Sequence, residues 1–128
     1  MAVQKQSVYQ VQRIEELQGY VRTVDHVRKL VAELESNRAA SPKILKNISD
    51  NIARDLSHMR QRALTANLGT LPDVAGSLAV VSARQGTGIN VKIRALQDGM
   101  NSISMQLDQS LKMAHEAKPE KEQEKKQS

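Results

Sequence analysis

The sequence predicts an all-α protein, an antiparallel bundle of three long helices and one short helix followed by a disordered, charged C-terminal tail. Apolar residues recur every three or four positions over nearly the whole of the 128 residues, which is the spacing of one helical face. All three prolines, Pro42, Pro72 and Pro119, stand where these apolar stripes begin or end, as expected of a residue that disrupts helix interiors. The loops between the stripes are short, and short loops make neighbouring helices antiparallel.

The first two helices are predicted from long stripes. Apolar positions from Ile14 to Leu34 indicate a helix from about Ser7 to Arg38. The second helix begins at Ser41 and Pro42, because serine can accept a hydrogen bond from a free amide and proline suits the first helical position. We expect it to stop at Gly69, since a left-handed residue often ends a helix.

The segment between Gly69 and Gly86 predicts a helix of at most four turns. Thr70 and Asp73 have the spacing of a capping pair at its start. Residues 77–83 would alternatively form a buried strand, but the sequence offers no partner strand, so we favour a helix. The longest stripe then predicts a helix from about Ile89 to about Lys118.

The chain is expected to form one domain, residues 1–117, followed by a tail. Residues 118–128 contain no apolar residue and alternate in charge, which predicts disorder. With two tyrosines, no Phe and no Trp, the core must be built from aliphatic side chains and methionine. Two glycines, Gly19 and Gly99, lie inside predicted helices, where they are either tolerated or mark close contact between helices.

The net charge of +5 does not indicate a nucleic-acid surface. Residues 1–70 hold 11 basic and 7 acidic side chains without a cluster, and stacking aromatics are lacking. We therefore regard nucleic acid as an unlikely partner. A weak nucleic-acid binder stays our third hypothesis, and it would use Arg38, Lys43, Lys46, Arg54, Arg60 and Arg62.

Membrane, metal and enzymatic roles are not indicated. No apolar run approaches the roughly 20 residues that span a bilayer, and no leader pattern opens the chain, so we expect a cytoplasmic protein. The chain has no cysteine, and its histidines, His26, His58 and His115, lie too far apart for a paired helical metal site. We expect no metal, no cofactor and no catalytic residue.

Residues 55–66 of the second helix contain Ser57 and His58, followed by Leu64 and then Thr-Ala. This stretch of about a dozen residues resembles the phospho-accepting helix of the histidine kinase dimerisation domain. The resemblance implies a regulatory bundle in which His58 accepts a phosphoryl group. Met59 stands where that family has an acidic residue, which would orient the imidazole.

The loop Gly86, Thr87 and Gly88 precedes a predicted helix, whose first amides can bind an anion. Lys92 and Arg94 lie in the first turns of that helix, where positive charge opposes the helix dipole. An anion or an acidic partner would relieve this repulsion. The alternative is a flexible hinge beside two solvated cations.

Together these features favour a non-enzymatic helical protein that acts by association with itself or with a partner's helix, as an adaptor or scaffold. The short helix is about half as long as the others, so part of the apolar stripe on the first and last helices should lack a cover. An uncovered strip usually marks an association surface, and two-fold pairing is the commonest way to close it. We therefore expect a homodimer.

Overall fold

A computed structural model describes residues 7–116, and within them the chain is all-α, as predicted. It contains four helices: α1 (Val8–Ser36), α2 (Pro42–Ala63), α3 (Leu71–Ala83) and α4 (Ile89–Glu116). Residues 77–83 lie in α3, so the strand alternative is wrong. The predicted tail, residues 118–128, lies outside the described residues.

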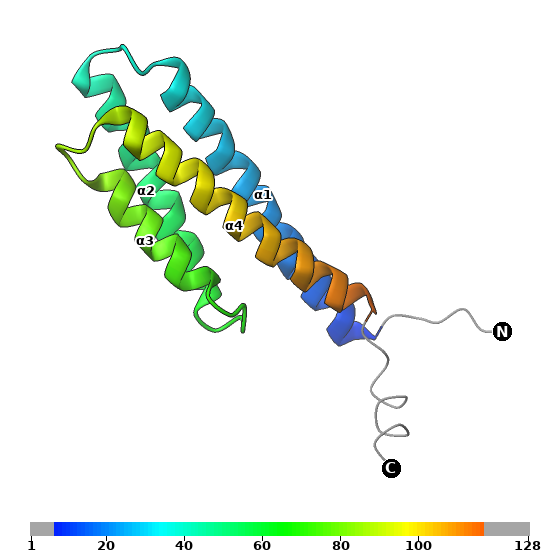
Figure 1. The fold of residues 1–128 in the computed structure, drawn as a ribbon. Helices are drawn as coiled ribbons and strands as arrows, with labels where there is room; N and C mark the ends of the chain where they lie inside the picture. Colours follow the sequence, from blue (N-terminus) through cyan, green and yellow to red (C-terminus); the bar gives the residue numbers. More distant parts are fainter. Residues whose placement is uncertain (1–6, 117–128) are drawn as a thin grey trace.

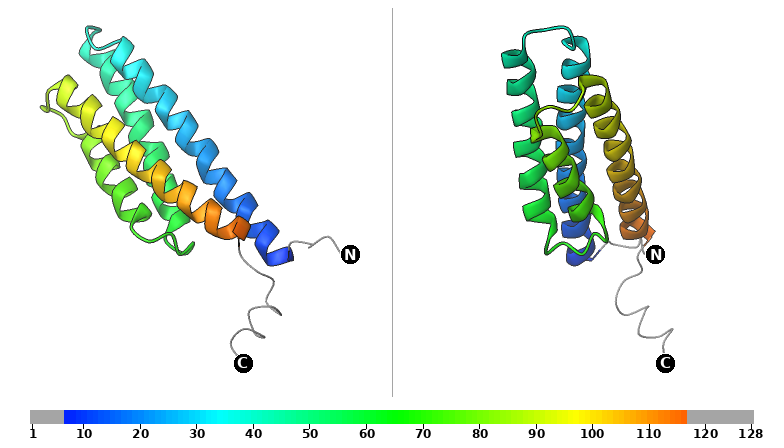
Figure 2. Two further views of the ribbon diagram at one scale, coloured as in Figure 1. Left: turned by 45° about the vertical axis from the view of Figure 1, so that its right-hand side comes forward. Right: turned by 60° about the vertical axis from the view of Figure 1, so that its left-hand side comes forward.

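The four helices form an antiparallel bundle in which each helix packs against two others (Figures 1 and 2). α1 packs against α2 and α4, and α3 packs against the same two helices. The pairs α1 with α3 and α2 with α4 therefore lie on the diagonals. Within the described residues, no helix is both long enough and apolar enough to cross a membrane.

The core is aliphatic and follows the predicted stripes. Ile52, Leu56, Leu96 and Ile103 are completely buried at its centre. Tyr20 is buried on the α2 side of α1, where the Arg62 guanidinium lies 5.3 Å from the centre of its ring. The stripes on α1, α2 and α4 thus all turn toward a single core.

Helix boundaries agree with local signals except between α2 and α3. Ser41 caps α2 as predicted, since its hydroxyl accepts from the Ile44 amide at 3.4 Å. α2 does not continue to Gly69 but ends at Ala63. Asn67 and Gly69 both adopt positive φ angles, 55° and 62°, and the chain folds back there so that Leu68 is buried.

The predicted capping pair at the start of α3 is also wrong. Thr70 precedes the helix, but its side chain makes no capping hydrogen bond. The hydroxyl instead donates to Oε1 of Gln106 on α4 at 3.3 Å. A hydrogen bond to α4 has therefore taken the place of the predicted capping bond.

α1 and α4 are longer than α2 and α3, and at one end of the bundle they extend past the α2–α3 loop (Figure 1). The stripe on these two helices is nevertheless covered almost throughout, because they pack against each other and against Leu68. The expectation of an uncovered stripe is therefore wrong for the stripe residues themselves. Gln10 contributes to this closure by donating from Nε2 to the Ala114 carbonyl at 2.7 Å.

Candidate functional site

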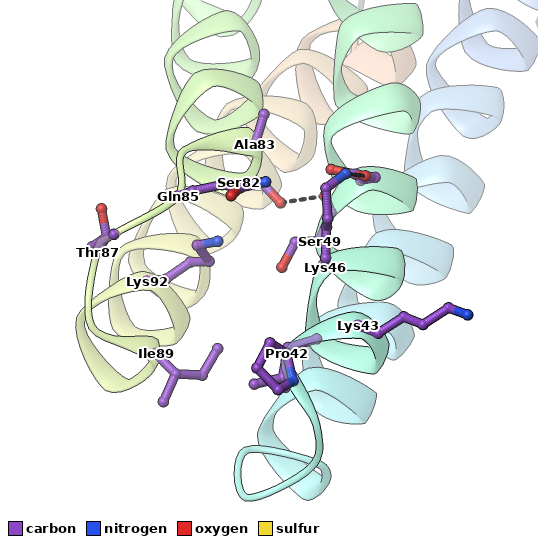
Figure 3. A pocket seen from close by; sticks show the side chains of 13 residues that line it. Pro42, Lys43, Lys46, Ser49, Ser82, Ala83, Gln85, Thr87, Ile89 and Lys92 are labelled. Carbon is purple, nitrogen blue, oxygen red and sulfur yellow. Dashed lines mark hydrogen bonds and ion pairs between the residues drawn. The ribbon is translucent and has the colours of Figure 1, made fainter.

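A pocket of about 430 Å³ lies where α2, the end of α3 and the start of α4 meet (Figure 3). The predicted loop forms one wall through Gly86 and Thr87, and Lys92 lines it from α4. Gly86 has a φ of 84°, which is readily available only to glycine, so the loop can turn sharply into α4. The turn at Gly86 and Thr87 therefore brings the start of α4 to the edge of the pocket.

Two residues of the predicted anion site do not line this pocket. Gly88 and Arg94 do not line the pocket, and Arg94 is exposed on the surface of α4. The structure thus unites three of the five predicted residues, Gly86, Thr87 and Lys92, in a single cavity.

The opposite wall comes from α2 and was not predicted. Ser49 and Asp50 line the pocket, and Ser49 is only 3% exposed. Its hydroxyl oxygen is buried and has no hydrogen-bond partner among the residues that the structure describes. The backbone carbonyl of Ser49 accepts a hydrogen bond of 2.7 Å from the buried hydroxyl of Ser82, which fixes the end of α3 against α2.

The charged side chains that line the pocket differ in whether they have a partner of opposite charge. Lys46 forms an ion pair with Asp50, with Nζ 2.6 Å from Oδ2. Lys92 is 8% exposed, and no carboxylate of residues 7–116 lies within ion-pair distance of its ammonium. Burial lowers the pKa of Lys92, while the more distant Asp50 carboxylate opposes this shift. Lys92 is therefore a buried cation that lacks a direct partner.

His58 lies in a different place, a shallow groove between α1 and α2. Its side chain is exposed, and the nearby carboxylate of Asp55 is directed to another residue. Asp55 Oδ2 lies 3.1 Å from Nε2 of His26 on α1. Among residues 7–116, no ion pair joins the His58 imidazole to a carboxylate, whereas His26, 29 positions before Asp55 in the sequence, has such a partner.

The basic residues of the third hypothesis do not form one cluster. Lys43 and Lys46 line the pocket described above, whereas Arg54 and Arg60 line a different surface pocket between α2 and α3. Arg38 donates to Asn90 at 3.2 Å, Lys46 is paired with Asp50, and Arg62 lies over Tyr20. Within residues 7–116, no group of three His, Cys, Asp or Glu side chains could hold a metal ion.

Exposed apolar side chains gather where α1 and α4 extend past the other helices. Val8 and Tyr9 are 74% and 79% exposed at the start of α1, and Met113 is 65% exposed near the end of α4. Arg13 lies on the face of α1 that meets the α2–α3 loop, since its guanidinium donates to the carbonyl of Ala66 in that loop at 2.6 Å. Tyr9 lies one turn before Arg13 and so continues this face beyond the loop.

Comparisons with protein-family models, with curated proteins and with solved structures find no match for this chain.

Proposed function

We propose that the chain is a cytoplasmic, non-enzymatic association protein that forms a two-fold dimer through the end where α1 and α4 extend past α2 and α3. The observation that carries this proposal is the exposure of Tyr9 and Met113 at that end. A tyrosine and a methionine together offer apolar area of the kind that interface centres favour.

The geometry of the bundle suggests a second copy as the occupant. Along most of their length α1 and α4 are accompanied by α2 and α3, but at this end only the α2–α3 loop accompanies them. Met113 lines a shallow surface pocket with Arg13 and Leu68, at the point where the loop ends. Two copies related by a two-fold axis would restore a four-helix cross-section there, because each would supply the two helices that the other lacks.

The test is the molar mass in solution, measured by light scattering after size exclusion at low micromolar concentration. The proposal expects twice the chain mass of 14.2 kDa. A double variant, Tyr9→Ser with Met113→Gln, should shift the protein to monomer while circular dichroism shows an intact bundle, since both side chains are exposed.

Val91→Gln is the matched control, because Val91 is 64% exposed on α4 but lies at the opposite end of the bundle. This variant should remain dimeric. A wild-type protein that is monomeric at every concentration would refute self-association. Equal dissociation by the control would refute the proposed surface.

A further inference from the structure

We propose that the pocket between α2, α3 and the start of α4 binds a phosphate monoester, with the phosphate held by Lys92 and Ser49 and the organic part against the apolar wall. This site is independent of the proposed dimer surface, which lies at the other end of the bundle.

The Ser49 hydroxyl supplies the first observation. A buried hydroxyl without a hydrogen-bond partner is unfavourable, and a serine inside a helix can avoid this cost by donating to the carbonyl four residues earlier. Ser49 makes no such bond, and its hydroxyl points into the pocket (Figure 3). A ligand that accepts a hydrogen bond would satisfy it.

Lys92 supplies the second observation in favour of an anionic ligand. Burying an ammonium without a direct counter-ion is unfavourable, yet Lys92 extends from α4 into the same space as the Ser49 hydroxyl (Figure 3). Lys46 already neutralises the nearest carboxylate, that of Asp50, at 2.6 Å. Lys43 also lines the pocket, but its side chain points away from the cavity (Figure 3). The unpaired positive charge inside the cavity is therefore that of Lys92, and an anion is the chemical group that complements it.

The start of α4 adds partial positive charge beside the pocket. Gly88 precedes the helix and has no side chain with which to cap it, and the described residues offer no acceptor to the amides of residues 89–91. Free amides and the helix dipole give this terminus a partial positive charge. Of residues 88–91 only Ile89 lines the pocket, so the terminus contributes a potential that favours an anion, while the Ser49 hydroxyl and the Lys92 ammonium are the groups that would contact the phosphate.

The rest of the pocket fits a small organic group. Pro42, Leu45 and Ile89 form an apolar part of the lining. The volume of about 430 Å³ exceeds what inorganic phosphate alone would fill and lies in the range of small-molecule pockets. We therefore expect a phosphate carried on a compact apolar body to bind more tightly than free phosphate.

Titration of the full-length, isotope-labelled protein with phenyl phosphate, followed by amide NMR, tests this directly. Shifts should concentrate at residues 49, 86–88 and 92, and inorganic phosphate should cause the same shifts at higher concentration. Benzoate separates phosphate from carboxylate recognition. Absence of shifts at millimolar phenyl phosphate, shifts elsewhere, or tighter binding of benzoate would each overturn the proposal.

Variants then assign the residues. Lys92→Gln should weaken phenyl phosphate about tenfold or more, as expected for a lost hydrogen bond to a charged group. Ser49→Ala should weaken it by about fivefold, the effect of about 1 kcal/mol. The amide spectra of both variants should show that the bundle is retained.

Lys43→Gln is the matched control, because it removes the same charge from the pocket rim, but the Lys43 side chain points away from the cavity (Figure 3). It should change the affinity by less than about twofold, consistent with weak interactions of exposed charges. An effect as large as that of Lys92→Gln would show diffuse attraction and overturn the assigned site. Unchanged affinity in Lys92→Gln would do the same.

Discussion

Replacing Gly99 by alanine tests how closely α3 approaches α4. A Cβ atom at position 99 would lie 2.7 Å from Cγ of Leu78 and would overlap both of its methyl groups. Leu78 is 6% exposed and forms part of the core, so it cannot turn out into solvent without loss of packing. We therefore expect Gly99→Ala to destabilise the bundle, although alanine is the better helix former.

The magnitude follows from two opposing effects. Alanine gains about 1 kcal/mol over glycine in a helix interior, whereas overpacking a core costs about 1 to 3 kcal/mol. Three atoms of Leu78 fall well inside normal contact distance, which places the cost near the upper end of that range. The net loss in the free energy of unfolding is then about 2 kcal/mol, or about 10 °C in Tm for a domain of this size.

Gly19→Ala is the control. A Cβ there would meet Nη2 of Arg22 at 3.7 Å, an ordinary contact, so the helix propensity should prevail and the variant should gain about 1 kcal/mol. Urea denaturation followed by far-ultraviolet circular dichroism measures both variants. In a Leu78→Ala background, Gly99→Ala should lose its penalty. Equal stabilisation by the two single substitutions would refute the close approach of α3 to α4.

Three further predictions concern the core, the buried lysine and the histidine. Ile52→Ala and Ile103→Ala should each lower the free energy of unfolding by about 2 to 4 kcal/mol, because both side chains are completely buried; a loss typical of surface sites would contradict this. Lys92→Met should stabilise the protein at neutral pH. Since burial lowers the Lys92 pKa from 10.5, the unfolded chain binds this proton more tightly, and wild-type stability should rise relative to the variant as pH increases from that lowered pKa to 10.5. Urea denaturation of both proteins at several pH values checks this, because the difference between their free energies of unfolding cancels the contribution of the other ionisable groups. A difference that does not change with pH would contradict the prediction. His58→Ala should change stability by less than about 0.5 kcal/mol, as for an exposed residue without special contacts. Labelled, acid-labile phosphate on the wild type but absent from this variant would instead support phosphotransfer.

The sequence predicts those parts of the fold that depend on neighbours along the chain. The Ser41 cap, the proline at the start of α2 and the apolar stripes are local signals, and each has its expected role. Just beyond the end of α2, Leu68 is buried, and it lines a surface pocket with Arg13 of α1 and Met113 of α4. Thr70 likewise binds Gln106 rather than its own helix. Local patterns could not anticipate these tertiary contacts.

The candidate site likewise has one part that the sequence predicts and one part that it does not. Gly86, Thr87 and Lys92 form a recognisable loop and helix start, so the sequence identifies one wall of the pocket. Ser49 lies 43 positions before Lys92, and no motif links them. The only sequence signal for Ser49 is that a polar residue stands next to Ile48, which belongs to the buried stripe. The sequence cannot show that such a serine faces a cavity.

The arrangement of the helices also has a consequence for the order of folding. α2 and α3 are joined by the seven residues 64–70, whereas the pairing of α1 with α4 encloses the 52 residues 37–88. Each doubling of a closed loop adds about 0.6 kcal/mol of entropic cost, so closing the larger loop costs about 1.7 kcal/mol more. We expect the α2–α3 hairpin to belong to the folding nucleus and α1 to join α4 late, so that alanine substitutions in the hairpin slow folding while those at the α1–α4 end mainly speed unfolding. Stopped-flow kinetics with the opposite pattern would contradict this order. Late pairing means that the projecting end of α1 and α4 is the first part of the bundle to open, and in a dimer formed there the lifetime of the native state would increase with protein concentration.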